Sequence, residues 1–362
     1  MPEIVDADTH IIEPPEMWAH LDESLYSRRP VVVKVPNDTL YGNTNAMWLI
    51  DGQIFPRPGG KGGFRIATPS AQERQQLRTD VPLGSRELTD PAVRVSDMDR
   101  DDVDFQIVYP TLFLIYVTAD PVLEAGLARA YNKFLGEACA ATNGRIRWVA
   151  VLPFGSIDAS IEEMHLAKEA GASGLFFMGM AGERSLADPY LFPIYEEASK
   201  LNMPICIHIG SGNPALNDVF DFQLSGVFLS SSSLPIVGFR DLVLNRIPDR
   251  FPDLRFGLLE ATASWVPHCL YTMRRQFGGD AEGWGPRLFE ENRIFIACEV
   301  EEDIPYLVNF IGEDHLMMGS DYAHTDPARE AQMTAKMKER TDVPQSTIDK
   351  ALGSNARLFY GL

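Results

Sequence analysis

The chain has 362 residues, of which 45% are hydrophobic, and its 32 basic and 51 acidic side chains give a formal net charge of −19. This charge argues against a nucleic acid or an anionic membrane surface as a partner. The sequence shows no secretory leader, no apolar run long enough to cross a membrane, and only four scattered cysteines. We therefore expect a cytoplasmic protein with reduced thiols.

The predicted elements begin with a short apolar strand at the start of the chain. A Pro- and Gly-rich excursion at about residues 15–90 follows, which we interpret as a cap-like insertion in one domain that spans residues 1–362. From about residue 96, short apolar runs alternate with segments of helical periodicity. Strands are predicted at residues 3–10, 105–110, 146–153, 174–178, 204–209, 254–260, 293–298 and 316–321. Helices are predicted at residues 122–141, 156–170, 189–201, 234–246, 263–277, 304–311 and 344–360.

The pattern of these elements indicates the fold class. Nearly continuous apolar strands are typical of a parallel sheet that is buried on both faces. Eight such strands separated by helices favour an α/β fold of the (β/α)8 TIM-like barrel type. The alternative is an open doubly wound sheet, although no G-x-G-x-x-G motif follows any of the strands.

Side chains that can bind a metal stand at the ends of four predicted strands. Asp8 and His10 close the first strand, and their spacing places both on one face. The fifth, sixth and eighth strands end in His208, Glu260 and Asp321. In a barrel the carboxyl ends of all strands meet at one rim, so these residues would converge there. Histidine and carboxylate ligands suit zinc, manganese or iron.

Each of these residues also has a simpler interpretation. His208 alone could be a core histidine bonded to the backbone, Glu260 could pair with an arginine, and Asp321 could cap a helix. Four such coincidences at four strand ends weigh in favour of a divalent metal site.

Six short segments carry a resemblance to a known family. They are DTHIIEP at residues 8–14, RVSDMD at 94–99, PICIH at 204–208, RFPDL at 250–254, GSDY at 319–322 and NA at 355–356. In combination they resemble the amidohydrolase superfamily, in the branch related to aminocarboxymuconate semialdehyde decarboxylase. The resemblance implies a distorted (β/α)8 barrel with one divalent ion. We expect zinc, with manganese or iron as alternatives, and the implied ligands are Asp8, His10, His208 and Asp321.

Two positions depart from the decarboxylases of that branch. Where they have His-x-His or a glutamate, this chain has Asp8-x-His10, and where they place a catalytic histidine after the sixth strand, it has Glu260. A metal ion in this site would support hydrolysis or non-oxidative decarboxylation of a small organic acid or amide. Asp321 and Glu260 are then the candidate catalytic acid/base residues.

Two alternatives from other classes stay open. Some relatives in this superfamily are oxygenases with a dinuclear iron or manganese/iron centre. In such an enzyme Glu13, Glu260, His324 and Asp326 would bind or support a second metal, although a capped loop before Pro327 is the slightly favoured interpretation of the last two residues. The chain could also be a supporting subunit that forms a hetero-oligomer with a paralogue.

The expected partner is a small-molecule substrate, and we expect the chain to form a homo-oligomer if it acts alone. Tyr109, Phe177 and Trp265 lie near predicted strand ends and are candidate walls of the substrate pocket, although such aromatic residues are more often part of the core.

Overall fold

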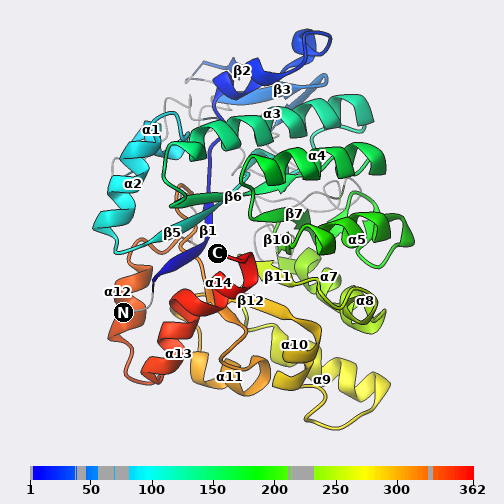
Figure 1. Ribbon diagram of the computed structural model, residues 1–362, viewed down its shortest axis with the longest axis vertical. Coiled ribbons are helices and arrows are strands. Elements are labelled where there is room, and N and C mark those ends of the chain that lie inside the picture. The colour runs from blue at the N-terminus through cyan, green and yellow to red at the C-terminus, as the bar shows by residue number, and fades with distance from the viewer. Residues whose placement is uncertain are drawn as a thin grey trace.

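Eight parallel strands form the central sheet of the protein. The structure is a computed structural model that describes residues 3–36, 38, 46–55, 69, 81–210, 213, 232–324 and 329–362. The order of the strands across the sheet follows their order along the chain, and helices surround them (Figure 1). The predicted (β/α)8 barrel is therefore confirmed. Its strands are β1 (Val5–His10), β5 (Phe105–Tyr109), β6 (Ile146–Val151), β7 (Gly174–Met178), β10 (Ile205–His208), β11 (Phe256–Leu259), β12 (Ile294–Cys298) and β13 (Leu316–Met318).

A short contact between β1 and the segment after β13 closes the sheet into a barrel. The amide of Asp321 donates to the carbonyl of Asp8 at 3.0 Å, and the amide of His10 donates to the carbonyl of Tyr322 at 2.8 Å. Both bonds lie at the carboxyl ends of these strands. The bonds that close the barrel therefore lie at the same carboxyl-end rim as the predicted metal-binding residues.

Side-chain N-caps begin two of the long helices. The side chain of Asp120 accepts the amides of Val122 and Leu123 at the start of α3 (Pro121–Ala140), and the side chain of Ser156 accepts the amide of Ala159 at the start of α4 (Ile157–Glu169). The other helices longer than one turn are α2 (Pro91–Arg100), α5 (Phe192–Lys200), α7 (Ser232–Leu244), α9 (Val266–Phe277), α10 (Pro286–Asn292), α11 (Ile304–Ile311), α12 (Met333–Glu339), α13 (Gln345–Asp349) and α14 (Asn355–Tyr360). The short turns are α1 (Leu83–Arg86), α8 (Ile247–Arg250) and the 3-10 turns η1 (Pro15–His20), η2 (Tyr26–Arg28), η3 (Leu112–Leu114) and η4 (Pro189–Leu191).

Some elements differ from the predicted ones. The segment predicted as one helix at 344–360 contains a π-helical turn, η6 (Lys350–Ser354), between α13 and α14. The helices α2, α10 and α12 were not predicted, because each is short and has few apolar residues at helical spacing. Within the described ranges, no helix combines the length and the apolar character that crossing a bilayer requires.

The excursion after β1 contains a small antiparallel sheet of β2 (Val31–Lys34), β3 (Ala46–Ile50) and β4 (Gln53–Phe55). It lies beside α3 in Figure 1. Arg28 bridges Asp51 and Asp120 at 2.6 Å each, and the Thr118 hydroxyl donates to Asp51 at 2.8 Å. These bonds attach the excursion to the segment that follows the carboxyl end of β5. Its role as a cap stays a prediction, and its Gly-rich tip at 59–63 lies outside the described residues.

Candidate metal centre

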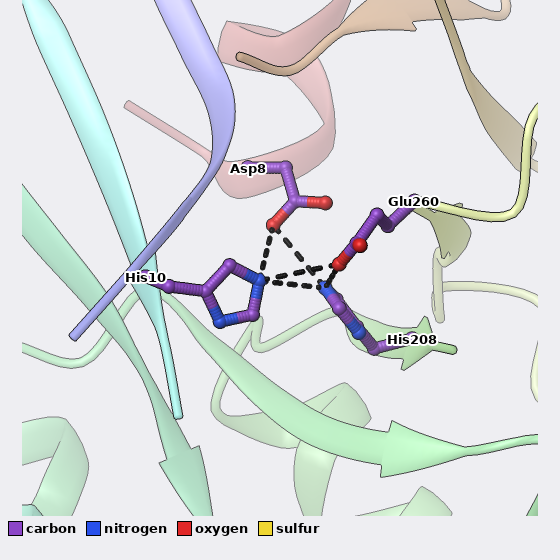
Figure 2. A group of neighbouring side chains, drawn as sticks. All are labelled: Asp8, His10, His208 and Glu260. Atoms are coloured by element: carbon purple, nitrogen blue, oxygen red, sulfur yellow. Dashed lines mark hydrogen bonds and ion pairs between the residues drawn. The ribbon is translucent and has the colours of Figure 1, made fainter. Parts of the chain in front are cut away.

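Asp8, His10, His208 and Glu260 point toward one another at the carboxyl end of the barrel (Figure 2). They come from β1, from β10 and from the residue after β11. Nε2 of His208 lies 3.2 Å from Nε2 of His10, 3.3 Å from Oδ1 of Asp8 and 3.1 Å from Oε2 of Glu260. Nε2 of His10 lies 3.3 Å from the same Glu260 oxygen. One ligand-capable atom of each side chain thus faces a common point.

Asp321 and His324 form another side of this cluster. Oδ1 of Asp321 lies 3.5 Å from Nε2 of His10 and 2.7 Å from Nδ1 of His324. The imidazole of His324 stacks on that of His10, with ring centroids 3.7 Å apart. His10, Glu260, Asp321 and His324 make a second group of four possible ligands, which shares His10 and Glu260 with the first.

Two carboxylates of the cluster stand on left-handed backbone. Glu260 and Asp321 each have a φ of 51°, just after β11 and β13. Residues other than glycine rarely adopt this region, and where they do, the strain is often found at functional sites. The strained turns therefore support a functional role for these two residues.

Hydrogen bonds fix which nitrogen of each imidazole faces the cluster. Nδ1 of His10 lies 3.0 Å from the carbonyl of Pro110, and Nδ1 of His208 lies 3.0 Å from the carbonyl of Ile209. Since a carbonyl only accepts, each Nδ1 is the nitrogen that donates to the backbone, and each Nε2 is the ring nitrogen turned toward the cluster. Both rings therefore present a ligand atom toward Asp8 and Glu260.

The site has the electrostatics and the space that a metal ion requires. Burial, together with the nearby His324 and His208, lowers the pKa of His10 well below its ordinary value. Burial, together with His208 and Arg86, does the same to the pKa of His324. Both imidazoles are then neutral near pH 7, in the form that binds metals. A cavity of about 20 Å³ beside Asp8, Glu260 and Asp321 has room for about one water-sized particle.

The donor set fits a divalent ion. Neutral imidazoles and carboxylates in a buried pocket suit zinc, manganese or iron. The residues that could hold the ion are the predicted Asp8, His10, His208 and Asp321, together with Glu260, which lies as close to the histidines as Asp8 does.

The structure brings only some of the residues predicted for a second metal into the cluster. Glu260 and His324 lie in the cluster. Glu13 does not, because its carboxylate accepts the amides of Thr111 and Leu112 at 2.9 and 3.0 Å, and burial raises its pKa to about 7. Asp326 lies outside the described residues.

A cavity of about 720 Å³ opens between the loops that follow β5, β6 and β7. Phe176 lines it, and the ring of Phe176 lies 6.1 Å from that of His208. Met178 also lines it and is paired with His208 across neighbouring strands. The cavity therefore adjoins the candidate metal centre.

The three predicted pocket residues lie in different places, and their contact with a substrate stays a prediction. Phe177 faces α5, because alternate residues of a strand point to opposite sides. Its ring centroid lies 6.0 Å from that of Tyr195 in α5 and 4.7 Å from that of Phe154 in the loop after β6. Its neighbour Phe176 lines the cavity instead. Trp265 packs on Phe239, with ring centroids 5.2 Å apart, and is not among the described residues that line this cavity.

Tyr109 does lie against the centre, with its ring 5.0 Å from that of His208. Its hydroxyl meets that of Tyr360 at 2.5 Å, inside the barrel. It is therefore a neighbour of the metal centre and is not a wall of the larger cavity.

Sequence reasoning overlooked several residues that support the site. The pairing of β7 with β10 explains why Phe176 faces inward. His208 faces the inside of the barrel, so its strand partner Met178 does too, and Phe176, two residues before Met178, points to the same side. Thr111, whose hydroxyl lies 2.8 Å from Nε2 of His324, gave no signal in the sequence.

Comparisons with known proteins identify the family. The family model described as "Amidohydrolase" matches residues 5–362, so the chain belongs to the amidohydrolase family. The chain is 25% identical over 284 residues to the 2-amino-3-carboxymuconate-6-semialdehyde decarboxylase of Dictyostelium discoideum, which covers 75% of this chain and 77% of the relative. The resemblance stated from the sequence motifs is therefore confirmed.

Solved structures support the same fold. An amidohydrolase from Mycobacterium avium subsp. paratuberculosis superposes with a TM-score of 0.74 at 19% identity, over 100% of this chain and 98% of that one. A 5-carboxyvanillate decarboxylase from Novosphingobium aromaticivorans, solved with manganese and 4-hydroxy-3-methoxy-5-nitrobenzoic acid, gives a TM-score of 0.62 at 20% identity, over 81% of this chain and 85% of that one. At these identities the likeness is one of fold.

Proposed function

We propose that the protein is a divalent-metal-dependent carboxy-lyase that removes CO2 from a small aromatic or unsaturated carboxylic acid. The observation that carries the proposal is the convergence of Asp8, His10, His208, Glu260 and Asp321 at one end of the barrel. The named relatives, which include decarboxylases of an unsaturated and of an aromatic acid, favour loss of CO2 over hydrolysis of an amide.

The metal would be held by Asp8, His10, His208 and Asp321, with Glu260 as a further candidate ligand. When bound, a divalent ion polarises the oxygen atoms that coordinate it. The protein's own contribution is to hold the imidazoles of His10 and His208 beside the carboxylates in a buried arrangement before the substrate arrives.

The proton that replaces CO2 is assigned to Asp321. The Thr111 hydroxyl donates to the carbonyl of Ile11 at 2.6 Å, so its oxygen accepts Nε2–H of His324. Nδ1 of His324 lies 2.7 Å from Oδ1 of Asp321, so the imidazole can exchange a proton with that carboxylate. The carbanion left by CO2 needs such a proton.

Glu260 is the other acid/base candidate. Its Oε2 lies within hydrogen-bond distance of Nε2 of His208, at 3.1 Å, and beside Asp8 and Asp321 around the small cavity. From there it can orient a water molecule or a substrate hydroxyl. In a hydrolase, the same position would serve to activate the attacking water.

Metal analysis combined with a product assay tests the proposal. We expect about one divalent ion per chain in the purified protein and release of CO2 from 2,6-dihydroxybenzoate or 5-carboxyvanillate. In D2O, the product should carry one deuterium at the carbon that lost the carboxylate. Asp321→Asn should abolish this exchange. Turnover of amides without CO2 release would contradict decarboxylation and favour hydrolysis.

The second candidate function is an O2-activating hydroxylase with two adjacent iron or manganese ions, for which His10, Glu260, Asp321 and His324 would supply ligands to the second ion. Two such ions per chain, with turnover that consumes O2, would support it over the carboxy-lyase. A metal-loaded chain that is inactive alone and gains activity with a co-purified paralogue would indicate a supporting subunit.

A further inference from the structure

The cavity beside β5, β6 and β7 is far larger than the metal centre needs. Its volume of about 720 Å³ falls within the range of about 300–1,000 Å³ that is usual for small-molecule sites. It adjoins His208 through Phe176 and Met178. A molecule whose carboxylate reached the metal centre would therefore place the rest of its body in this cavity.

Apolar side chains form much of the cavity wall. Phe113, Phe154, Phe176, Met178 and Met180 all line it. Aromatic rings offer flat contact area, and methionine side chains adapt to irregular shapes. The wall therefore suits an aromatic or aliphatic group.

Acidic residues outnumber basic residues in the described lining of the cavity. Among the described residues, Glu124, Glu183 and Asp188 stand against one cation, Arg184. That cation is already engaged, since Arg184 lies 3.5 Å from Asp188 and its guanidinium stacks 3.9 Å from the ring centroid of Tyr190. An anionic group in the cavity would meet an excess of negative charge, whereas a neutral or cationic group would not.

We infer that this cavity receives an apolar segment of the substrate whose far end is neutral or positively charged, and not anionic. The inference rests on the proposed function for the place of the reacting carboxylate. It narrows the substrate class to acids with one reacting carboxylate and an extended apolar body.

Binding of matched probes tests the inference without turnover. The probes are 2-hydroxybenzoic acid and three derivatives with a five-carbon arm that ends in a methyl, an ammonium or a carboxylate group. Each is titrated by calorimetry into the metal-loaded, full-length protein. The methyl and ammonium arms should tighten binding by about tenfold or more relative to 2-hydroxybenzoic acid. The carboxylate arm should bind about tenfold more weakly than the ammonium arm.

Two cavity variants, each with a matched control, test whether the binding preferences of the arms arise in this cavity. Met180→Trp should remove the gain from the methyl arm, whereas Leu166→Trp on the exposed face of α4 should not. Glu183→Gln should reduce the preference for ammonium over carboxylate, whereas Glu282→Gln, outside the cavity, should leave it unchanged.

The outcomes separate this inference from the proposed function. Equal affinities for all arms, tighter binding of the carboxylate arm, or no binding of any arm at millimolar concentration would overturn the inference. Arm-dependent binding in a protein that releases no CO2 from any probe would support the cavity's preference and count against decarboxylation.

Discussion

Arg94 donates a hydrogen bond from Nη1 to the backbone carbonyl of His10 across 2.8 Å. Its fully buried guanidinium also donates to the Thr9 hydroxyl and to the side-chain carbonyl of Gln106, each at 2.7 Å. The ring of Tyr322 lies 4.7 Å from the guanidinium carbon. Arg94 thus joins β1, β5 and the segment after β13 directly behind the candidate ligand His10.

Replacing Arg94 should disturb both stability and metal binding. Arg94→Met leaves three buried acceptors without their donor, and we expect a loss of about 3 kcal/mol or more in the free energy of unfolding. Denaturant unfolding and metal content per chain are the measurements. Arg275→Met on exposed α9 is the control and should change neither. A loss below about 1 kcal/mol with full metal content would show that Arg94 is dispensable.

The histidines should be required for metal binding. His10→Ala and His208→Ala each remove one imidazole whose Nε2 faces the cluster, so the metal content per chain should fall strongly. His268→Ala, on the exposed side of α9, is the matched control. Full occupancy by elemental analysis in both site variants would refute the ligand assignment.

The position of Gly319 has no room for a side chain, so Gly319→Ala should be destabilising. A Cβ at this position would lie 2.5 Å from Cβ of Asp8 and 3.2 Å from its amide nitrogen. Gly319→Ala must therefore push Asp8 and β1 away, at a cost of about 1–3 kcal/mol in stability, and should weaken metal binding. A thermal melt with and without added metal measures both effects. Gly283→Ala, in the loop before α10, should be nearly neutral, and equal behaviour of the two variants would contradict the steric argument.

Glu13 should make stability depend on pH. Burial raises its pKa to about 7 in the folded protein, from an ordinary value of 4.5. Between these values the folded state keeps a proton that the unfolded state releases, so stability is full below about pH 4.5 and falls as pH rises to about 7. The loss from this group is about 3 kcal/mol.

Glu13→Gln should remove that part of the decline while still accepting the amide of Thr111. Unfolding free energies measured from pH 4.5 to 8 should therefore fall less steeply in the variant than in the parent protein. Glu16→Gln on η1 is an exposed control. Identical slopes in the Glu13 variant and its parent would mean that Glu13 is ionised throughout.

The barrel could be predicted from the sequence because its strands are short, apolar and regularly spaced. Each of the eight predicted strands overlaps one strand of the barrel, since burial on both faces leaves an unmistakable apolar run. The ends of those runs also identified Asp8, His10, His208, Glu260 and Asp321, because a barrel rim collects strand ends.

The features that the sequence does not reveal depend on contacts that no local pattern encodes. Phe177 was chosen over Phe176 because the strand is apolar on both sides, so alternation gives no sign of which face is inward. His324 could not be placed, because its position follows from a stacking contact with His10, distant in the sequence. The small sheet of the excursion was missed because the prolines and glycines around β2, β3 and β4 indicate loops.

The closure of the barrel between Asp8 and Asp321 has a consequence for biosynthesis. Asp8 and His10 leave the ribosome first, and Asp321 and His324 follow roughly 300 residues later. At about 5–20 residues per second, that interval lasts on the order of 15–60 s. During this interval one edge of β1 lacks the segment after β13 that will pair with it, and Asp321 and His324 are still missing from the cluster. A chain that ended before Asp321 would therefore keep Asp8, His10, His208 and Glu260 but would lack Asp321, His324 and the backbone bonds that close the barrel.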